Sequence, residues 1–343
     1  MQIITRLIAL HPRNVFRISR AARRETVNVF LRLDRDGIVG SGEASANAYY
    51  GENPAEVARK LEGVRGFLEG RPIDSPADIE SVWRDAWPML APSRAAQCAL
   101  DVALWDWLGK GKGLTVTELA LGQKPEPVAS FATIGISETG EMDRKIAELA
   151  GFPFVKIKSN ETGDLSAARR IRAAMPEARV AVDANCAWAE VDFGRIAVEL
   201  RSIGVEFVEQ PLPPAADARM PGLCAALPAP VLADESCVTV EDVERMPGHF
   251  AGFNIKLVKC GGLTPALQMV RRGRELGLET MVGCMLESSL LIAAGAVVGQ
   301  ITDYADLDGA WLLADDPARG WKFDRGVLQP PSTPGLGVEI LKE

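Results

Sequence analysis

Short apolar runs alternate with longer amphipathic segments along the chain from about residue 129 onward. The runs are rich in β-branched and aromatic residues, and most of them end in or beside a charged side chain. They cover residues 154–158 (FVKIK), 180–185 (VAVDAN), 205–211 (VEFVEQP), 231–236 (VLADES), 253–259 (FNIKLVK), 280–285 (TMVGCM) and 304–309 (YADLDG). Such alternation predicts parallel β-strands separated by helices, which is an α/β fold.

The runs recur about every 25 residues, a spacing that suits one strand, one helix and two loops. Roughly eight such units close into a (β/α)-barrel of about 250 residues. The carboxyl ends of the strands meet at one mouth of such a barrel. The sequence therefore predicts a modified TIM barrel in which residues far apart along the chain share one site.

The N-terminal part of the chain has a different pattern. Residues 27–33 and 38–43 are β-rich and flank the turn sequence DRDG. Apolar residues at helical spacing follow at 53–69, 76–90 and 93–108. Strands followed by helices predict an α+β capping domain. We expect this cap over residues 1–115, the barrel over 116–320, and a C-terminal segment over 321–343 that returns to the cap.

Composition narrows the function. The 343 residues carry a net charge of −8, which disfavours a general nucleic-acid binder. There are only two histidines, so the chemistry is expected to depend on carboxylates and lysines. The six cysteines form no CxxC pair, which disfavours zinc knuckles and suggests a reducing compartment. The N-terminus lacks a signal-peptide pattern, and the longest apolar stretch, 290–299, is too short to cross a bilayer. We expect a cytoplasmic protein without a membrane or nucleic-acid partner.

Three consecutive runs end in or next to carboxylates, namely Asp183, Glu209 and Asp234. Three such groups at one barrel mouth would repel each other strongly in a low-dielectric site. A divalent cation removes this repulsion, and oxygen ligands suit Mg²⁺ or Mn²⁺. Polar strand ends that serve only solvation are the alternative, and they explain a single acid better than three in register.

Lysines flank these acids on both sides. Lys156 and Lys158 are two residues apart on one run, so their side chains face the same way. Lys256 follows Asp234 by one strand and is expected across the barrel from Lys158. A lysine close to a divalent cation has a lowered pKa and can accept a proton near neutrality. Two lysines on opposite faces of one carbon suit a racemase or epimerase. Lys259 lies in the KCGG turn and is expected on a loop.

The motifs VKIK (155–158), VDAN (182–185), VEQPL (208–212), LADES (232–236) and NIKLVKCGG (254–262) together resemble the enolase superfamily. The resemblance is to its muconate-lactonizing subgroup and covers nearly the whole chain. It implies that Asp183, Glu209 and Asp234 bind Mg²⁺, that Lys158 and Lys256 are the acid/base pair, and that Lys156 stabilises an enolate. The segment ETMVGCMLESS has no histidine, which disfavours the mandelate-racemase subgroup.

Within this subgroup the chain is similar to dipeptide epimerases, and in particular to L-Ala-D/L-Glu epimerases. The resemblance implies that Asp306 and Asp308 clamp the substrate's ammonium group. It places Thr133 beside the substrate and Arg20, on a cap loop over 17–24, against an acidic side chain. A second cap loop is expected over 47–52. The implied activity is epimerisation at the C-terminal residue of a dipeptide through an enediolate, as in recycling of cell-wall peptides. Glu287 departs from the pattern, and an added anion would favour a less acidic or cationic substrate.

Other readings stay open at this point. N-acylamino acid racemisation, o-succinylbenzoate synthesis and cycloisomerisation use the same lysines and metal ligands. Their substrates have no free ammonium group, so Asp306 and Asp308 disfavour them. A non-catalytic binding barrel is a further alternative, although intact lysines and carboxylates argue against it. A homo-oligomer is compatible with the sequence.

Overall fold

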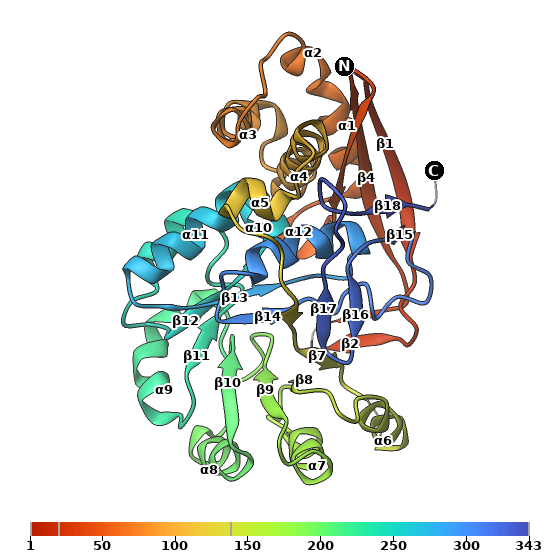
Figure 1. Cartoon of the computed structure of the whole chain (residues 1–343). Coiled ribbons are helices and arrows are strands. Elements are labelled where there is room, and N and C mark those ends of the chain that lie inside the picture. The colour runs from red at the N-terminus through yellow and green to blue at the C-terminus, as the bar shows by residue number, and fades with distance from the viewer. Residues whose placement is uncertain (1, 20, 138, 342–343) are drawn as a thin grey trace.

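The computed structural model describes residues 2–19, 21–137 and 139–341, and its largest sheet has eight parallel strands (Figure 1). They are β7 (Ala132–Ile134), β8 (Phe154–Lys158), β9 (Arg179–Asp183), β10 (Val205–Glu209), β11 (Val231–Ala233), β12 (Gly252–Lys256), β13 (Glu279–Gly283) and β14 (Tyr304–Asp306). Phe131 donates its backbone N–H to the Ala305 carbonyl at 2.8 Å, so the two edges nearly close. The predicted modified TIM barrel is confirmed.

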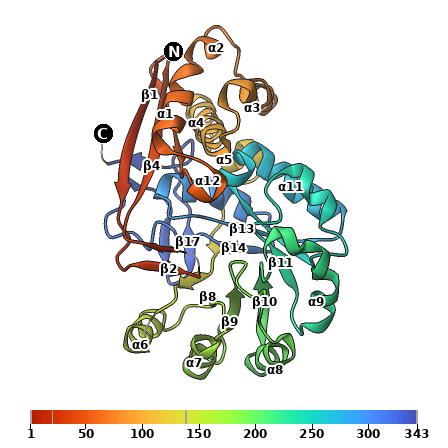
Figure 2. The same ribbon diagram turned by 180° about the vertical axis from the view of Figure 1, so that it is seen from behind.

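Helices cover the outside of this barrel, as Figures 1 and 2 show from opposite sides. They are α6 (Thr139–Glu148), α7 (Ser166–Ala174), α8 (Phe193–Ile203), α9 (Met220–Ala226), α10 (Leu257–Cys260), α11 (Leu263–Glu275) and α12 (Ser289–Gly299). Two 3₁₀ turns, η2 (Pro214–Arg219) and η3 (Val240–Arg245), lie before β11 and β12. No helix in the described ranges is long and apolar enough to cross a membrane.

The barrel interior changes character from bottom to top. An apolar cluster fills its lower part, with Phe131, Ala181, Phe207, Leu232 and Met281 packed together. Side chains two residues apart on a strand face the same way. The next inward positions on β9, β10 and β11 are therefore the three carboxylates of the sequence prediction. The apolar layer forms a dry floor beneath a charged mouth.

The cap is built on an antiparallel sheet of β1 (Gln2–Leu10), β4 (Thr26–Arg35) and β5 (Ile38–Ala44). Its helices are α1 (Pro54–Gly63), α2 (Arg65–Leu68), α3 (Pro76–Leu90), α4 (Arg94–Lys112) and α5 (Val116–Leu121). Helix α4 packs very closely on β5, because a Cβ atom on Gly42 would lie 1.9 Å from the Ala99 carbonyl. The predicted α+β cap is thus present, with the helix expected over 53–69 in two pieces and β1 as an unpredicted strand.

The expected cap loop over 17–24 is a hairpin instead. Its strands are β2 (Phe16–Ile18) and β3 (Ala21–Arg23), and Arg20 lies outside the described residues. The hairpin reaches the barrel, since Arg17 accepts a hydrogen bond from the Ile136 N–H at 3.0 Å. The second expected loop contains the 3₁₀ turn η1 (Ala48–Tyr50). Backbone pairing between these two short strands makes the segment a hairpin, which its amino-acid composition did not predict.

The chain after the barrel forms β15 (Ala318–Arg319), β16 (Lys322–Asp324), β17 (Val327–Gln329) and β18 (Glu339–Ile340), and β17 also pairs with β6 (Val128–Ala129). Leu336 donates its N–H to Asp106 of α4 at 2.9 Å, and β18 lies beside β1 (Figures 1 and 2). These contacts join the C-terminal segment to the cap, and the domain limits at 115 and 320 stay a prediction.

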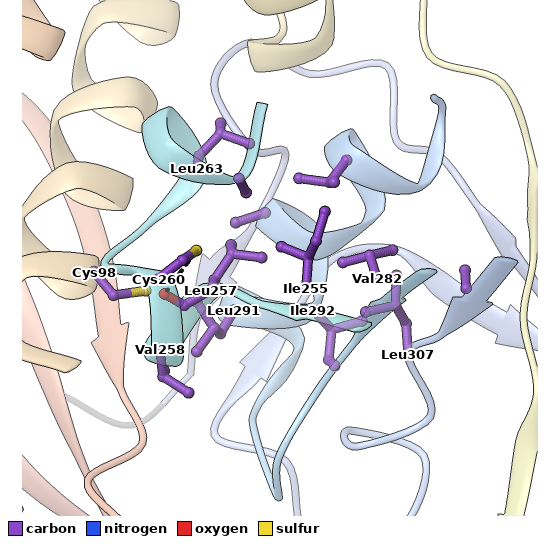
Figure 3. Packing of buried hydrophobic residues seen from close by; sticks show 14 of the residues in the cluster. Cys98, Ile255, Leu257, Val258, Cys260, Leu263, Val282, Leu291, Ile292 and Leu307 are labelled. Carbon is purple, nitrogen blue, oxygen red and sulfur yellow. Dashed lines mark hydrogen bonds between the residues drawn. The ribbon is translucent and has the colours of Figure 1, made fainter. Parts of the chain in front are cut away.

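One hydrophobic core joins cap and barrel. Figure 3 shows Cys98 of α4 against Cys260 of α10, next to side chains of β12 and α12 such as Ile255 and Ile292. These residues belong to a single buried cluster that also includes the inner face of the cap sheet. The cap is therefore held on the barrel by apolar packing as well as by its polar contacts.

Candidate active site

The three carboxylates lie side by side at the barrel mouth. Asp183 and Glu209 end β9 and β10 and are paired in register, and Asp234 directly follows β11. Each is at most 1% exposed. The repeating strand, loop and helix unit brings them together although they span more than fifty residues of sequence, as predicted.

Each carboxylate has a lysine partner. Lys158 Nζ lies 2.5 Å from Asp183 Oδ2, and Lys256 Nζ lies 2.7 Å from Asp234 Oδ2. Lys156 Nζ lies 2.8 Å from Glu209 Oε2. The Lys156 amine also pairs with Asp306. The predicted lysines and acids thus form two neighbouring groups of ion pairs, one around Lys156 and Lys158 and the other between Lys256 and Asp234.

Lys259 is a correction to the sequence prediction. The run 253–259 is a strand only as far as Lys256, and the short helix α10 then turns Lys259 inward. Its Nζ lies 2.6 Å from Asp234 Oδ1 and also donates to the carbonyls of Cys237 and Asn254. Lys259 is therefore buried and holds Asp234 in place, because the single turn of α10 directs its side chain toward Asp234.

Burial and charge act against each other in these ion pairs. Burial raises the pKa of Glu209 to about 7, and the neighbouring Asp183 adds to this effect. Burial also raises the pKa of Asp234, yet Lys256 and Lys259 lower it well below its usual value. Burial lowers the pKa of Lys256, but Asp234 and other acids raise it well above the ordinary lysine value. The sequence analysis expected a lysine with a lowered pKa. The neighbouring carboxylates give Lys256 a raised pKa instead.

The acidic donors suit a hard divalent cation. Three carboxylates on neighbouring strands supply the oxygen ligands that Mg²⁺ prefers, and repulsion from Asp183 adds to burial in raising the pKa of Glu209. Within the described ranges, no three His, Cys, Asp or Glu side chains converge as a finished metal site. Each carboxylate reaches a lysine instead. The donor set fits Mg²⁺, and binding would require these acids to turn from their lysines.

A second acidic pair lies at the end of β14. Thr133 donates its hydroxyl to Asp306 Oδ1 at 3.1 Å and its backbone N–H to Asp308 Oδ2 at 2.6 Å. Both acids are buried, and burial together with Asp306 raises the pKa of Asp308 to about 7. The structure thus brings Thr133, which was expected beside the substrate, against the two acids expected to hold the ammonium group.

A cavity lies between the barrel mouth and the cap. Its barrel wall includes Lys158, Lys256, Asp234, Thr133, Asp306 and Asp308. Its cap wall includes Phe16, Ile18, Arg23, Asn47 and Tyr50. Arg23 Nη2 donates to Asn47 Oδ1 at 3.2 Å. The sequence analysis located both cap segments but did not assign these cap residues to the site. The sequence NAYYGE over 47–52 was the signal that could have indicated Asn47 and Tyr50.

Glu287 does not act as an added anion in the cavity. It is 3% exposed, and its Oε1 accepts the Met285 N–H at 3.0 Å. Burial, and then the nearby Glu43, raise the pKa of Glu287 to about 8, so it holds its proton near neutral pH. The expected preference for a less acidic or cationic substrate therefore loses its electrostatic basis.

Family comparisons agree with this geometry. Residues 141–343 match the enolase C-terminal domain-like family, and residues 3–122 match the mandelate racemase / muconate lactonizing enzyme N-terminal domain. The chain belongs to the enolase superfamily.

Within that superfamily, dipeptide epimerases are prominent among the relatives. The chain is 36% identical to an L-Ala-D/L-amino acid epimerase of Flavobacterium johnsoniae, over 99% of this chain and 100% of that protein. An enolase family member from Agrobacterium tumefaciens, solved with sodium and L-Ala-L-Glu, has a TM-score of 0.86 and 33% identity over 96% of this chain and 97% of that one. A dipeptide epimerase of Methylococcus capsulatus, solved with Mg and L-Arg-D-Lys, has a TM-score of 0.89 and 31% identity over 98% of each chain.

Proposed function

We propose that the protein is a metal-dependent dipeptide epimerase. The observation that carries this proposal is a single cavity bordered by two lysines, Lys158 and Lys256, and by two acids, Asp306 and Asp308. The lysines can exchange a proton with a substrate carbon, and the acids can hold an ammonium group. The dipeptide epimerases among the relatives support the same reaction class.

Asp183, Glu209 and Asp234 are the residues that would hold Mg²⁺, with Mn²⁺ as the alternative ion. Bound there, the cation would supply positive charge next to a substrate carboxylate and would offset the acids that raise the pKa of Lys256. A relative solved with Mg supports this choice.

The two lysines carry the proton transfer. One amine, of Lys158 or Lys256, removes the α-proton of the C-terminal residue, and the negative charge moves onto the adjacent carboxylate as an enediolate. The other lysine, as an ammonium, delivers its proton to the opposite face of the same carbon. Lys156 is buried between Glu209 and Asp306 and supplies positive charge close to the developing anion. The net result is inversion at one carbon with no change in composition.

The acids beyond β14 orient the dipeptide. We propose that Asp306 and Asp308, held by Thr133, bind the free ammonium group of the N-terminal residue. Substrates without a free ammonium, such as N-acylamino acids, would offer no positive charge to the buried Asp308, whereas Asp306 already pairs with Lys156. The substrate we favour is L-Ala-D/L-Glu, with Arg20 directed at the acidic side chain, which corresponds to a role in cytoplasmic recycling of cell-wall peptides.

A deuterium-exchange screen tests this function. The protein is incubated in D₂O with Mg²⁺ and a panel of L-Ala-L-Xaa dipeptides, and the mass gain at the α-carbon is followed. The expected result is exchange with epimerisation, fastest for L-Ala-L-Glu. Exchange with other dipeptides but not with L-Ala-L-Glu would reject the Glu assignment and keep the epimerase class. Absence of exchange across the panel would reject the proposed function.

A further inference from the structure

Two polar side chains of the cap sheet reach across to the barrel. Asn28 of β4 and Glu43 of β5 are both 0% exposed. Asn28 Nδ2 donates to Glu43 Oε1 at 2.7 Å and to the Leu286 carbonyl at 3.0 Å. Ser288 donates its hydroxyl to Glu43 Oε2 at 2.5 Å and its backbone N–H to Glu43 Oε1 at 3.1 Å. We call Asn28, Glu43 and Ser288 the latch.

The latch contains a carboxyl group in an unusual setting. Among the described residues no Lys, Arg or His is paired with Glu43, and its partners are an amide, a hydroxyl and a backbone N–H. Burial raises the pKa of Glu43. Ser288 is the N-cap of α12, so the helix end partly offsets the negative charge. A buried acid without a cation costs stability, so simple adhesion of the cap does not explain it.

The barrel segment that the latch holds is a wall of the cavity. Cys284, Met285 and Leu286 line the cavity directly before Ser288. On its other side this segment presses against the chain after Asp308, because a Cβ atom on Gly309 would lie 2.6 Å from the Met285 carbonyl. The wall is therefore fixed between the cap sheet and the residues that follow the proposed ammonium site.

We propose that Asn28 and Glu43 are positioning residues that set the wall formed by residues 284–286 against the bound dipeptide. This inference rests on the proposed function. Through its hydrogen bonds, the latch fixes the position of residues 284–286 relative to the cap sheet. The cap wall and the barrel wall of the cavity therefore move together. Loss of the latch loosens the substrate site and leaves the lysines and carboxylates in place. The effect falls on substrate affinity more than on the chemical step.

The chain offers a matched control at the same helix end. Asp316 accepts the hydroxyl of Ser289 at 2.5 Å and the Ser289 N–H at 3.2 Å. It caps α12 with a carboxylate, as Glu43 does, but it comes from the chain segment after the barrel, and within the described residues its hydrogen bonds reach only Ser289 and Ala318. A merely structural role predicts that the loss of either acid lowers stability and leaves KM and the exposure of the wall unchanged.

The test compares Glu43→Ala, Glu43→Gln, Ser288→Ala and Asp316→Ala in the full chain, by thermal midpoint, KM and kcat for the best dipeptide. Glu43→Ala and Asp316→Ala are expected to lower the midpoint by similar amounts. Only Glu43→Ala should raise KM, by about 10-fold, with kcat within about 3-fold of the parent. Glu43→Gln should restore most of the affinity, because an amide oxygen can still accept from Ser288. Ser288→Ala removes one hydroxyl and should give an intermediate KM in a folded protein.

A second readout does not depend on the substrate. The alkylation rate of Cys284, mapped by peptide mass, should rise several-fold in Glu43→Ala and Ser288→Ala and stay at the parent rate in Asp316→Ala. Equal KM values and equal Cys284 rates in the Glu43 and Asp316 variants would overturn the latch. A parent protein inactive on every dipeptide would reject the proposed function, and the Cys284 rates would still decide the latch.

Discussion

The barrel mouth and the cap build the two walls of the cavity in different ways. At the mouth, Asp183, Glu209 and Lys256 lie on the ends of regular strands whose register fixes where each side chain points. On the cap, Arg23 and Tyr50 lie on a three-residue strand and a 3₁₀ turn. The mouth therefore presents fixed charges suited to one kind of chemistry, and the cap presents short irregular segments that can vary with the substrate. Mutations should separate chemistry from recognition along the same boundary.

The largest effect is expected from the metal-binding side of the mouth. Chelation with EDTA, or Asp234→Asn, should lower epimerase activity by about 1000-fold. Added Mg²⁺ should restore the chelated parent protein and leave the variant inactive. Asp303→Asn is the control, because Asp303 lies before β14, at the opposite end of the barrel, where it accepts hydrogen bonds from Thr280. Full activity in the presence of EDTA would contradict the proposed metal dependence.

Asp308→Asn should give the next largest effect. The amide oxygen can still accept the Thr133 N–H, but the charge that attracts an ammonium group is lost. KM for the free dipeptide should rise about 30-fold, because hydrogen bonds to charged groups are the strong ones. Initial rates over a range of dipeptide concentrations measure this. An unchanged KM would mean that the ammonium group binds elsewhere.

Changes on the cap should be smaller and should depend on the substrate. Arg20→Gln is expected to lower kcat/KM for L-Ala-L-Glu by about 10-fold and to leave L-Ala-L-Gln within about 2-fold. Arg23→Gln, tested in parallel because Arg23 lines the cavity, shows which arginine meets the acidic side chain. If both variants treat the two dipeptides alike, the cap does not select for the acid, and the contrast between cap and mouth loses its basis.

The smallest effect on activity is expected from Glu287, whose burial affects stability and its pH dependence instead. Burial raises the pKa of Glu287 from 4.5 to about 8, so the folded protein holds this proton more tightly than the unfolded chain. Its contribution to folding is full below pH 4.5 and decreases by about 1.4 kcal/mol per pH unit until about pH 8. Glu287→Gln should therefore flatten the fall in unfolding free energy over this range, as measured by urea titration at several pH values. Parallel curves for the two proteins would contradict the buried, protonated state.

Regularity explains which parts of the molecule the sequence could predict. The barrel strands and the residues Lys158, Asp183 and Glu209 follow from a repeat with a fixed period and a fixed side-chain alternation. Lys259 was mistaken for a loop residue because a single turn of α10 follows β12 without a change in composition. Strand β1 was missed because its exposed and buried positions do not alternate strictly.

The cap residues were harder to predict for a different reason. Tyr50 and Asn47 face the cavity only because the cap folds over the barrel mouth, and no local sequence pattern encodes that arrangement. The same holds for the latch, since Asn28 and Ser288 are 260 positions apart and meet only through the packing of two domains. Glu287 was correctly noticed as an acid near the mouth, but only burial shows that it keeps its proton.

The most direct test of the central claim is the stereochemistry of proton exchange in Lys158→Ala and Lys256→Ala. Each variant is incubated in D₂O with the L-L and the L-D epimer of one dipeptide, and deuterium at the α-carbon is measured by mass spectrometry. If two lysines work on opposite faces, both variants lose epimerisation, and each retains exchange with one epimer only, the two epimers being opposite. Continued epimerisation in either variant, or loss of exchange with the same epimer in both, would contradict the two-lysine account.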